Sequence, residues 1–146
     1  MKTVAKPIKK QSIKKLKDRV WDVFSKYIRM RDCLATTGSL EYGECFTCDE
    51  PPQHEFRKLQ AGHYVAGRHN SNLFSEKGCH AQCRRCNLFL GGNPHEYRER
   101  IDAMYGEGYH EILEQEAKQI KTFTVEELEG LLEHYREQIK QLEELR

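Results

Sequence analysis

Two Cys-x-x-Cys pairs constrain this chain more than any other feature of its sequence. Cys45 and Cys48 form the first pair, and Cys83 and Cys86 form the second. Each pair can turn two sulfurs toward one point, so the four thiolates fit a tetrahedral structural zinc site. The 34 residues between the pairs exceed the roughly 15–20 of a compact zinc ribbon. We therefore expect further structure inside this loop.

The six cysteines would also suit disulfides in a secreted protein. The first residues, MKTVAKPIKKQSIKK, contain no apolar run of the length that a signal peptide needs. No stretch reaches the roughly 20 apolar residues of a membrane span. We expect zinc-bound thiols in a reducing cytoplasm and no membrane partner, with paired disulfides as the alternative.

Charge is distributed unevenly along the 146 residues. Residues 1–31 carry eight Lys and three Arg against two Asp, whereas residues 111–146 carry ten Glu against five basic side chains. A basic arm of this kind favours a polyanionic partner such as DNA. The candidate phosphate contacts are Lys9, Lys10, Lys14 and Lys15. A solvated, partly disordered tail is the alternative.

The pattern of apolar residues and turn formers predicts an α+β fold in one compact domain. Residues 1–32 are expected to form a basic arm and an amphipathic helix, starting at Ser12 and ending near Asp32. Residues 33–106 form the expected zinc-bound core, with strands in LQAGHYV and CHAQC and a short helix through Asn87 and Leu90. Residues 107–146 form a C-terminal helical extension.

Three helices are expected after the core. Asn93 should cap the first, with Pro94 at its start and Gly106 at its end, and a second should cover residues 109–120. Thr124 and Glu127 form a capping box for the last helix. Its apolar stripe either packs on its own domain or forms a homodimer contact.

His63 and Asn87 suggest metal-dependent hydrolysis of phosphodiesters. A histidine with a pKa of about 6.5 can take a proton from water. Mg²⁺ or Mn²⁺ prefers oxygen ligands, such as a carboxamide, and stabilises the leaving oxygen. Since Asn87 follows Cys86 directly, the zinc site would fix its position, and His63 on a strand could face it.

The ordered series KYIRMRDC, CFTC, LQAGHY, HAQCRRCNLFLGGN and EYRE…YG, over residues 26–106, resembles the phage NinG (Rap) recombination proteins. More broadly, the chain resembles the HNH, or ββα-metal, nucleases. The resemblance implies a small zinc-stabilised ββα-metal core that cuts branched DNA, such as Holliday junctions and D-loops, in the host cytoplasm. It assigns His63 as general base, Asn87 as ligand of the catalytic ion, and the four paired cysteines to structural zinc.

Two positions depart from the HNH pattern. Gly62 stands where an acidic or histidine metal ligand usually precedes the base, and Gly78 stands where the middle Asn would fall. Both favour the alternative function, a non-catalytic zinc-dependent DNA-binding accessory protein. A zinc-scaffolded protein adaptor is a third possibility. His80 has a functional role, orienting His63 or binding metal, or else it is a structural histidine.

The remaining candidates are basic residues near the expected site. Arg68 and His69 follow the base and either bind the scissile phosphate or are solvent-exposed residues of a loop. Arg84 and Arg85 flank the second cysteine pair and have the same two interpretations. Asn93 is expected to be a helix cap rather than a second metal ligand.

Overall fold

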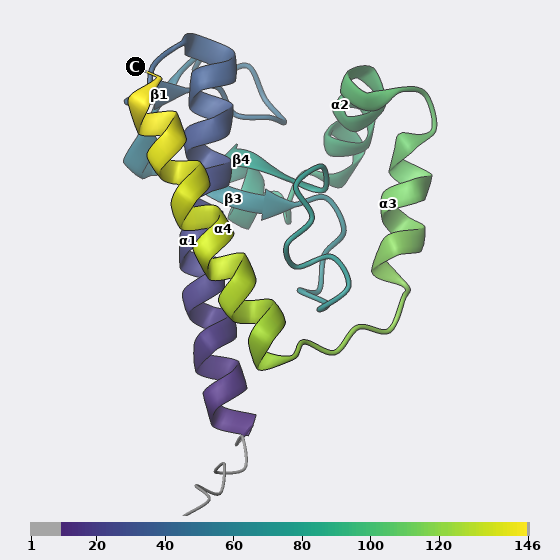
Figure 1. Cartoon of the computed structure of the whole chain (residues 1–146). Helices are drawn as coiled ribbons and strands as arrows, with labels where there is room; N and C mark the ends of the chain where they lie inside the picture. Colours follow the sequence, from purple (N-terminus) through teal and green to yellow (C-terminus); the bar gives the residue numbers. More distant parts are fainter. Residues whose placement is uncertain (1–9, 146) are drawn as a thin grey trace, which may run out of the picture.

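The computed structural model describes residues 10–145, which form an α+β fold as the sequence predicts. Helix α1 (Lys10–Thr37) is the longest element, and helix α4 (Val125–Glu144) lies along it in the same direction (Figure 1). Helices α2 (Pro94–Tyr105) and α3 (Tyr109–Ala117) lie on the far side of the central β-hairpin from α4 (Figure 1). Within residues 10–145, no helix has the length and hydrophobicity of a membrane span.

Helix α1 is longer than its apolar pattern indicates. It begins at Lys10 rather than at Ser12, and it continues past Asp32 to Thr37. Gly38 ends it, with a φ of 76° that lies in the left-handed region where glycine carries no steric cost. The expected boundary between residues 32 and 33 therefore falls inside this helix.

The apolar stripe of α4 packs against α1 in the same chain. Leu128 and Leu132 join Val20 in one core cluster, and the Phe24 ring meets the Tyr135 ring edge-on at 5.0 Å. Each fully buried side chain of this size contributes about 1.5–3 kcal/mol. Of the two arrangements that the sequence allowed for this stripe, the structure has the intramolecular one.

The central hairpin consists of β3 (Leu59–His63) and β4 (Cys79–Cys83), which pair antiparallel with Gly62 opposite His80. Since side chains alternate along a strand, one face turns toward α1 and packs Ala61, Ala81 and Cys79 into its core clusters. The other face turns toward α2. A second, shorter ladder pairs β1 (Tyr42–Gly43) with β2 (His54–Glu55), and the short helix η1 (Phe56–Lys58) leads from it into β3.

A short π-helix, η2 (Arg85–Phe89), follows β4 and precedes α2. Asn93 is the N-cap residue of α2 and Pro94 begins the helix, as predicted, and the Asn93 carbonyl accepts from the Tyr97 N–H at 2.9 Å, but the Asn93 side chain makes no capping hydrogen bond. The Asn93 backbone is left-handed, with a φ of 50°, and its side-chain amide donates to the Thr47 carbonyl at 3.0 Å. Gly106 ends α2 and Thr124 caps α4 by accepting from the Glu127 N–H at 3.1 Å, both as predicted.

Candidate functional site

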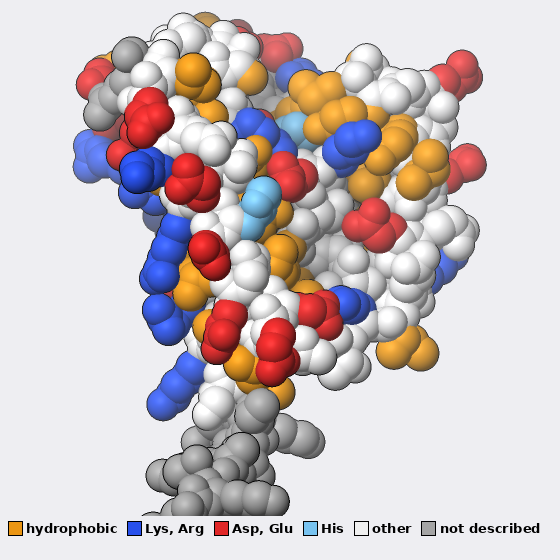
Figure 2. Space-filling view, in the orientation of Figure 1, with side chains coloured by type: hydrophobic (Ala, Val, Ile, Leu, Met, Phe, Trp, Pro, Cys, Tyr) orange, Lys and Arg blue, Asp and Glu red, His pale blue; other side chains and the backbone are white. Residues whose placement is uncertain are grey.

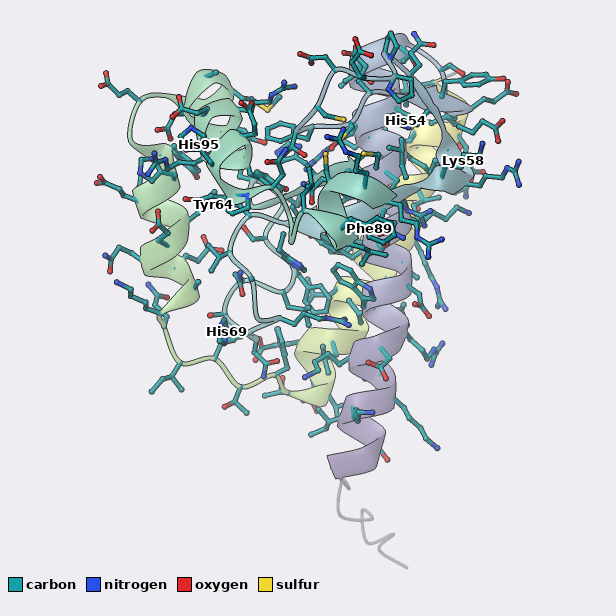
Figure 3. The ribbon with its side chains drawn as sticks, turned by 180° about the vertical axis from the view of Figure 1, so that it is seen from behind. His54, Lys58, Tyr64, His69, Phe89 and His95 are labelled. Carbon is teal, nitrogen blue, oxygen red and sulfur yellow. The ribbon has the colours of Figure 1, made fainter. Side chains whose placement is uncertain are left out.

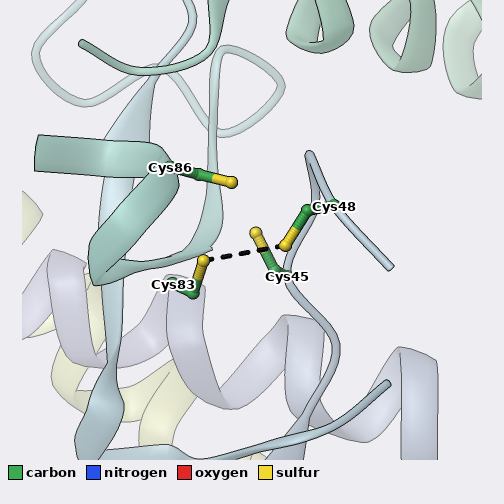
Figure 4. A group of neighbouring side chains, drawn as sticks. All are labelled: Cys45, Cys48, Cys83 and Cys86. Atoms are coloured by element: carbon green, nitrogen blue, oxygen red, sulfur yellow. Dashed lines mark hydrogen bonds between the residues drawn. The ribbon is translucent and has the colours of Figure 1, made fainter. Parts of the chain in front are cut away.

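Four cysteine side chains meet where the loop between β1 and β2 approaches the end of β4 and the following η2. The Sγ atoms of Cys45, Cys48, Cys83 and Cys86 all lie within 4.8 Å of one another (Figure 4). The Cys48 and Cys83 sulfurs are 3.7 Å apart, close to the roughly 3.8 Å that tetrahedral Zn–S bonds of about 2.3 Å require. The four thiols can therefore hold a structural zinc ion.

Neighbouring donors complete this sulfur site. The Thr47 N–H donates to the Cys45 sulfur at 3.4 Å, and the Asn93 amide lies 3.8 Å from the Cys86 sulfur. Such N–H groups stabilise thiolate charge around a metal. Cys33 and Cys79 are buried in other clusters of the core, so within the described residues the metal-binding group consists of the four paired cysteines alone.

His63 lies at the end of β3 on the face that turns toward α1. Its Nε2 lies 2.9 Å from the Leu73 carbonyl oxygen, and its ring stacks on Trp21 with centroids 5.2 Å apart. Because a carbonyl only accepts, Nε2 carries the proton and Nδ1 keeps its lone pair. Burial lowers the pKa of His63, and the Arg68 charge lowers it further, although the bond to Leu73 raises it. The imidazole is therefore neutral at neutral pH, with Nδ1 unprotonated.

Asn87 lies on the opposite face of the hairpin. Its Nδ2 donates to the Gln60 Oε1 at 2.8 Å, and its Oδ1 lies 2.8 Å from the point where a Cβ on Gly62 would stand. His63 is the next residue after Gly62 in the strand, so its side chain leaves from the other face. The expected arrangement, with the His63 ring and the Asn87 carboxamide facing one another across a cavity, is therefore wrong. The two groups flank the end of the same strand.

A second carboxamide oxygen reaches the space above Gly62. The Gln82 Oε1 lies 1.8 Å from the position of the same hypothetical Cβ. It is buried and has no hydrogen-bond partner within residues 10–145. Two oxygen donors from different elements therefore converge beside the strand end, and a hard cation such as Mg²⁺ or Mn²⁺ prefers donors of this chemistry.

His80 is placed in a structural network and not beside His63. Its Nδ1 lies 3.0 Å from the Asp32 carboxylate, its Nε2 lies 2.8 Å from the Tyr105 hydroxyl, and its ring stacks on Phe46 at 3.9 Å. Burial lowers its pKa, although the hydrogen bond to Asp32 raises it. Both ring nitrogens are occupied, so His80 has none free to bind a metal, and the part of the chain that is described gives it no hydrogen bond to His63.

Three basic side chains and Asp18 line a cavity that reaches the loop after β3. The basic residues are Lys14, Lys17 and Arg68, and the cavity, of about 750 Å³, has a wall that also includes Leu73, the partner of His63. The Arg68 guanidinium lies 4.9 Å from the centre of the Trp21 ring. Figure 2 shows basic side chains along the outer edge of α1, next to acidic side chains over α4.

The other predicted phosphate contacts are more scattered. Lys15 is exposed on α1 but does not line this cavity, and His69 is exposed beside the segment that follows α3 (Figure 3). Lys9 and the side chain of Lys10 lie outside the described residues.

Arg84 and Arg85 are exposed on the Asn87 side of the hairpin. Both line a cavity of about 530 Å³ together with Lys58 and Gln60, the partner of Asn87. Next to them, Phe89 is 75% exposed, and the Arg84 guanidinium lies 5.9 Å from the centre of its ring. Phe89 and Lys58 lie on the same side of the molecule in Figure 3.

Sequence reasoning missed Gln82 and the Leu73 carbonyl. The alternation of CHAQC could have placed Gln82 on the same face as His80, two residues before it. A main-chain carbonyl leaves no signal in the sequence, so the partner of His63 becomes visible only once the loop after β3 is folded.

A protein-family model described as the bacteriophage lambda NinG protein matches residues 2–144. No curated protein and no solved structure matches the chain.

Proposed function

The chain belongs to the NinG protein family of bacteriophage lambda, and from this membership we propose that it acts in phage recombination as a zinc-stabilised, metal-dependent DNA endonuclease. The proposed substrates are branched intermediates such as Holliday junctions and D-loops. The order strand, strand, short helix in β3, β4 and η2 supports an HNH-like core. Branch preference rests on the family resemblance.

One observation carries the hydrolytic proposal. The Leu73 carbonyl fixes the His63 ring with Nδ1 as the free base, and His63 directly follows Gly62, over which two carboxamide oxygens converge on the opposite face of the strand. A general base held in one tautomer, together with oxygen donors for a cation, is a combination that supports phosphodiester hydrolysis at this strand end.

In the proposed mechanism, His63 Nδ1 removes a proton from the attacking water. Asn87 Oδ1 would hold Mg²⁺ or Mn²⁺, which when bound supplies Lewis acidity to the phosphate and the leaving oxygen. Because His63 and Asn87 flank the strand end from two faces, the scissile phosphate would lie across that end. Lys14 and Arg68 on one side, and Arg84 on the other, would bind the flanking phosphates.

The second candidate is a non-catalytic DNA-binding accessory protein, and Gly62 is the observation that favours it. Without a side chain at this position, the strand contributes no anionic ligand, and the amides offer the ion no charge. Affinity for the ion would then depend on phosphate oxygens from DNA. In this candidate the basic residues would still bind DNA, but no bond would be cut.

A cleavage assay separates the two candidates. Wild type, His63→Ala and the exposed control His95→Ala are mixed with a four-way junction and Mg²⁺ or Mn²⁺. We expect His63→Ala to lose about 10²-fold or more of the cleavage rate with DNA affinity retained, and His95→Ala to match wild type. No cleavage by wild type would favour the accessory protein, and cleavage that survives His63→Ala would remove the proposed mechanism.

A homodimer remains a proposal for the active form, because a junction has approximate two-fold symmetry. The C-terminal helix was the proposed contact, and its buried stripe already packs on α1. A dimer through α4 would therefore use exposed residues of this helix. Light scattering with and without junction DNA measures the mass, and a monomer in both cases would exclude the dimer.

A further inference from the structure

Gln82 has a buried oxygen that finds no hydrogen-bond partner among residues 10–145. The side chain is fully buried in β4, and its Nε2 donates to the Thr47 Oγ1 and to the Gly92 carbonyl, both at 2.9 Å. Since the Gly92 oxygen can only accept, the NH₂ group must lie on that side. The orientation of the amide is thus fixed by chemistry, and Oε1 must point the other way.

The Gln82 Oε1 points toward Gly62, across the β3–β4 ladder. Gln82 Oε1 and Asn87 Oδ1 lie 1.8 Å and 2.8 Å from the same point, the site of the missing Cβ. Any side chain at position 62 would occupy the space that the Gln82 oxygen now takes. Gln82 thus places an oxygen where a ligand from residue 62 would begin.

Two carboxamide oxygens that face one space repel each other unless a donor or a cation lies between them. The Nδ2 of Asn87 is directed away, to Gln60, so both oxygens present lone pairs to that space. Asn72 provides a useful contrast. Its Oδ1 is also buried without a hydrogen-bond partner in the described part of the chain, yet its amide belongs to a different loop and donates to the Val65 carbonyl.

We propose that Gln82 Oε1 is a second protein ligand of the divalent ion at Asn87, in place of the side chain that Gly62 lacks. This inference rests on the proposed metal-dependent function. It gives the ion two neutral oxygen ligands from β4 and η2, with water and DNA phosphate oxygens in the remaining positions. It accounts for the glycine, because any larger residue there would displace the Gln82 oxygen.

The test is Mg²⁺ titration of the zinc-loaded full chain, followed by NMR of the side-chain amide groups. We expect the Gln82 and Asn87 signals to shift together with one dissociation constant, and the Asn72 signal to stay in place. A shift at Asn87 without one at Gln82 would overturn this proposal and leave the metal centre intact. No shift at either residue, with or without a DNA duplex, would remove the metal centre itself.

A matched pair of variants gives an independent measurement. Gln82→Glu adds a negative ligand and should tighten Mn²⁺ binding, measured by electron paramagnetic resonance, by about tenfold. The control Asn72→Asp makes the same chemical change at an oxygen that is likewise buried without a partner among residues 10–145, and it should leave Mn²⁺ binding unchanged. Zinc content and circular dichroism establish that both variants fold. Equal Mn²⁺ affinity in wild type and folded Gln82→Glu would contradict the proposal; if Gln82→Glu does not fold, the wild-type titration decides.

Discussion

Replacing Gly62 with alanine tests the close approach at the centre of the candidate site. The new methyl group would stand 1.8 Å from the Gln82 Oε1 and 2.8 Å from the Asn87 Oδ1. A side-chain end can often swing aside, but Gln82 is fully buried and held by two hydrogen bonds. The clash can be relieved only by breaking these bonds or by shifting the strand.

The cost follows from these contacts. Overpacking a well-packed site costs about 1–3 kcal/mol, and each broken hydrogen bond adds about 0.5–1.5 kcal/mol. We therefore expect Gly62→Ala to lower the free energy of unfolding by about 2–4 kcal/mol. This is a large part of the roughly 5–15 kcal/mol that keeps a domain folded.

Urea unfolding of the zinc-loaded protein measures this loss. The control is Gly130→Ala in α4, where an added Cβ meets no atom within 4 Å and the better helix former should stabilise by about 0.5–1 kcal/mol. The double variant Gly62→Ala/Gln82→Ala removes the clashing oxygen. It should therefore lose less stability than the two single changes together.

Two results would refute this reasoning about Gly62. A free energy of unfolding within about 0.5 kcal/mol of wild type would mean that the site has room for a methyl group. Strict additivity in the double variant would mean that the loss arises elsewhere than at Gln82.

Three further predictions concern the metal, the histidines and the last helix. Cys83→Ser should lose the zinc and several kcal/mol of stability, whereas Cys33→Ala should keep one zinc per chain; equal zinc content by atomic absorption would contradict the site. Burial lowers the pKa of His63 and of His80 from 6.5, so below this pH the unfolded chain binds more protons than the folded one. The urea midpoint should therefore fall as the pH drops below about 6.5. A midpoint that rises instead would contradict the lowered pKa values. Thr124→Ala should cost about 1 kcal/mol by removing the cap on the Glu127 N–H, and no change in thermal midpoint would contradict this.

Local sequence signals predicted much of this fold. The strand CHAQC and the beginning of LQAGHYV agree with β4 and β3, and Gly106 and Thr124 mark helix ends as predicted. These signals are short-range, because caps, glycines and alternation act within a few residues. The extension of α1 to Thr37 was missed because it depends on tertiary contacts. Asp32 and Cys33 are buried against the hairpin, and this burial stabilises helix beyond the end of the apolar stripe.

The candidate site was predictable in its parts but not in its geometry. The spacing of the two Cys-x-x-Cys pairs identified the four thiols, and the structure brings their sulfurs together as this spacing predicts. Spacing could not place Asn87 on the face opposite His63, because this depends on how η2 packs back onto β3, against Gln60 and Gly62. The role of His80 likewise depends on Asp32, 48 residues away in the chain, and such a long-range pair leaves no local pattern.

The stacking of Trp21 on His63 makes the protein its own optical probe. The chain has a single tryptophan, so all indole emission arises next to the proposed base and 4.9 Å from the Arg68 guanidinium. A charged imidazolium quenches indole emission by accepting an electron from the excited ring, whereas a neutral imidazole does so far less. The intensity as a function of pH should therefore follow protonation of His63 without any label, and a nucleic acid that draws Arg68 away should alter the same signal.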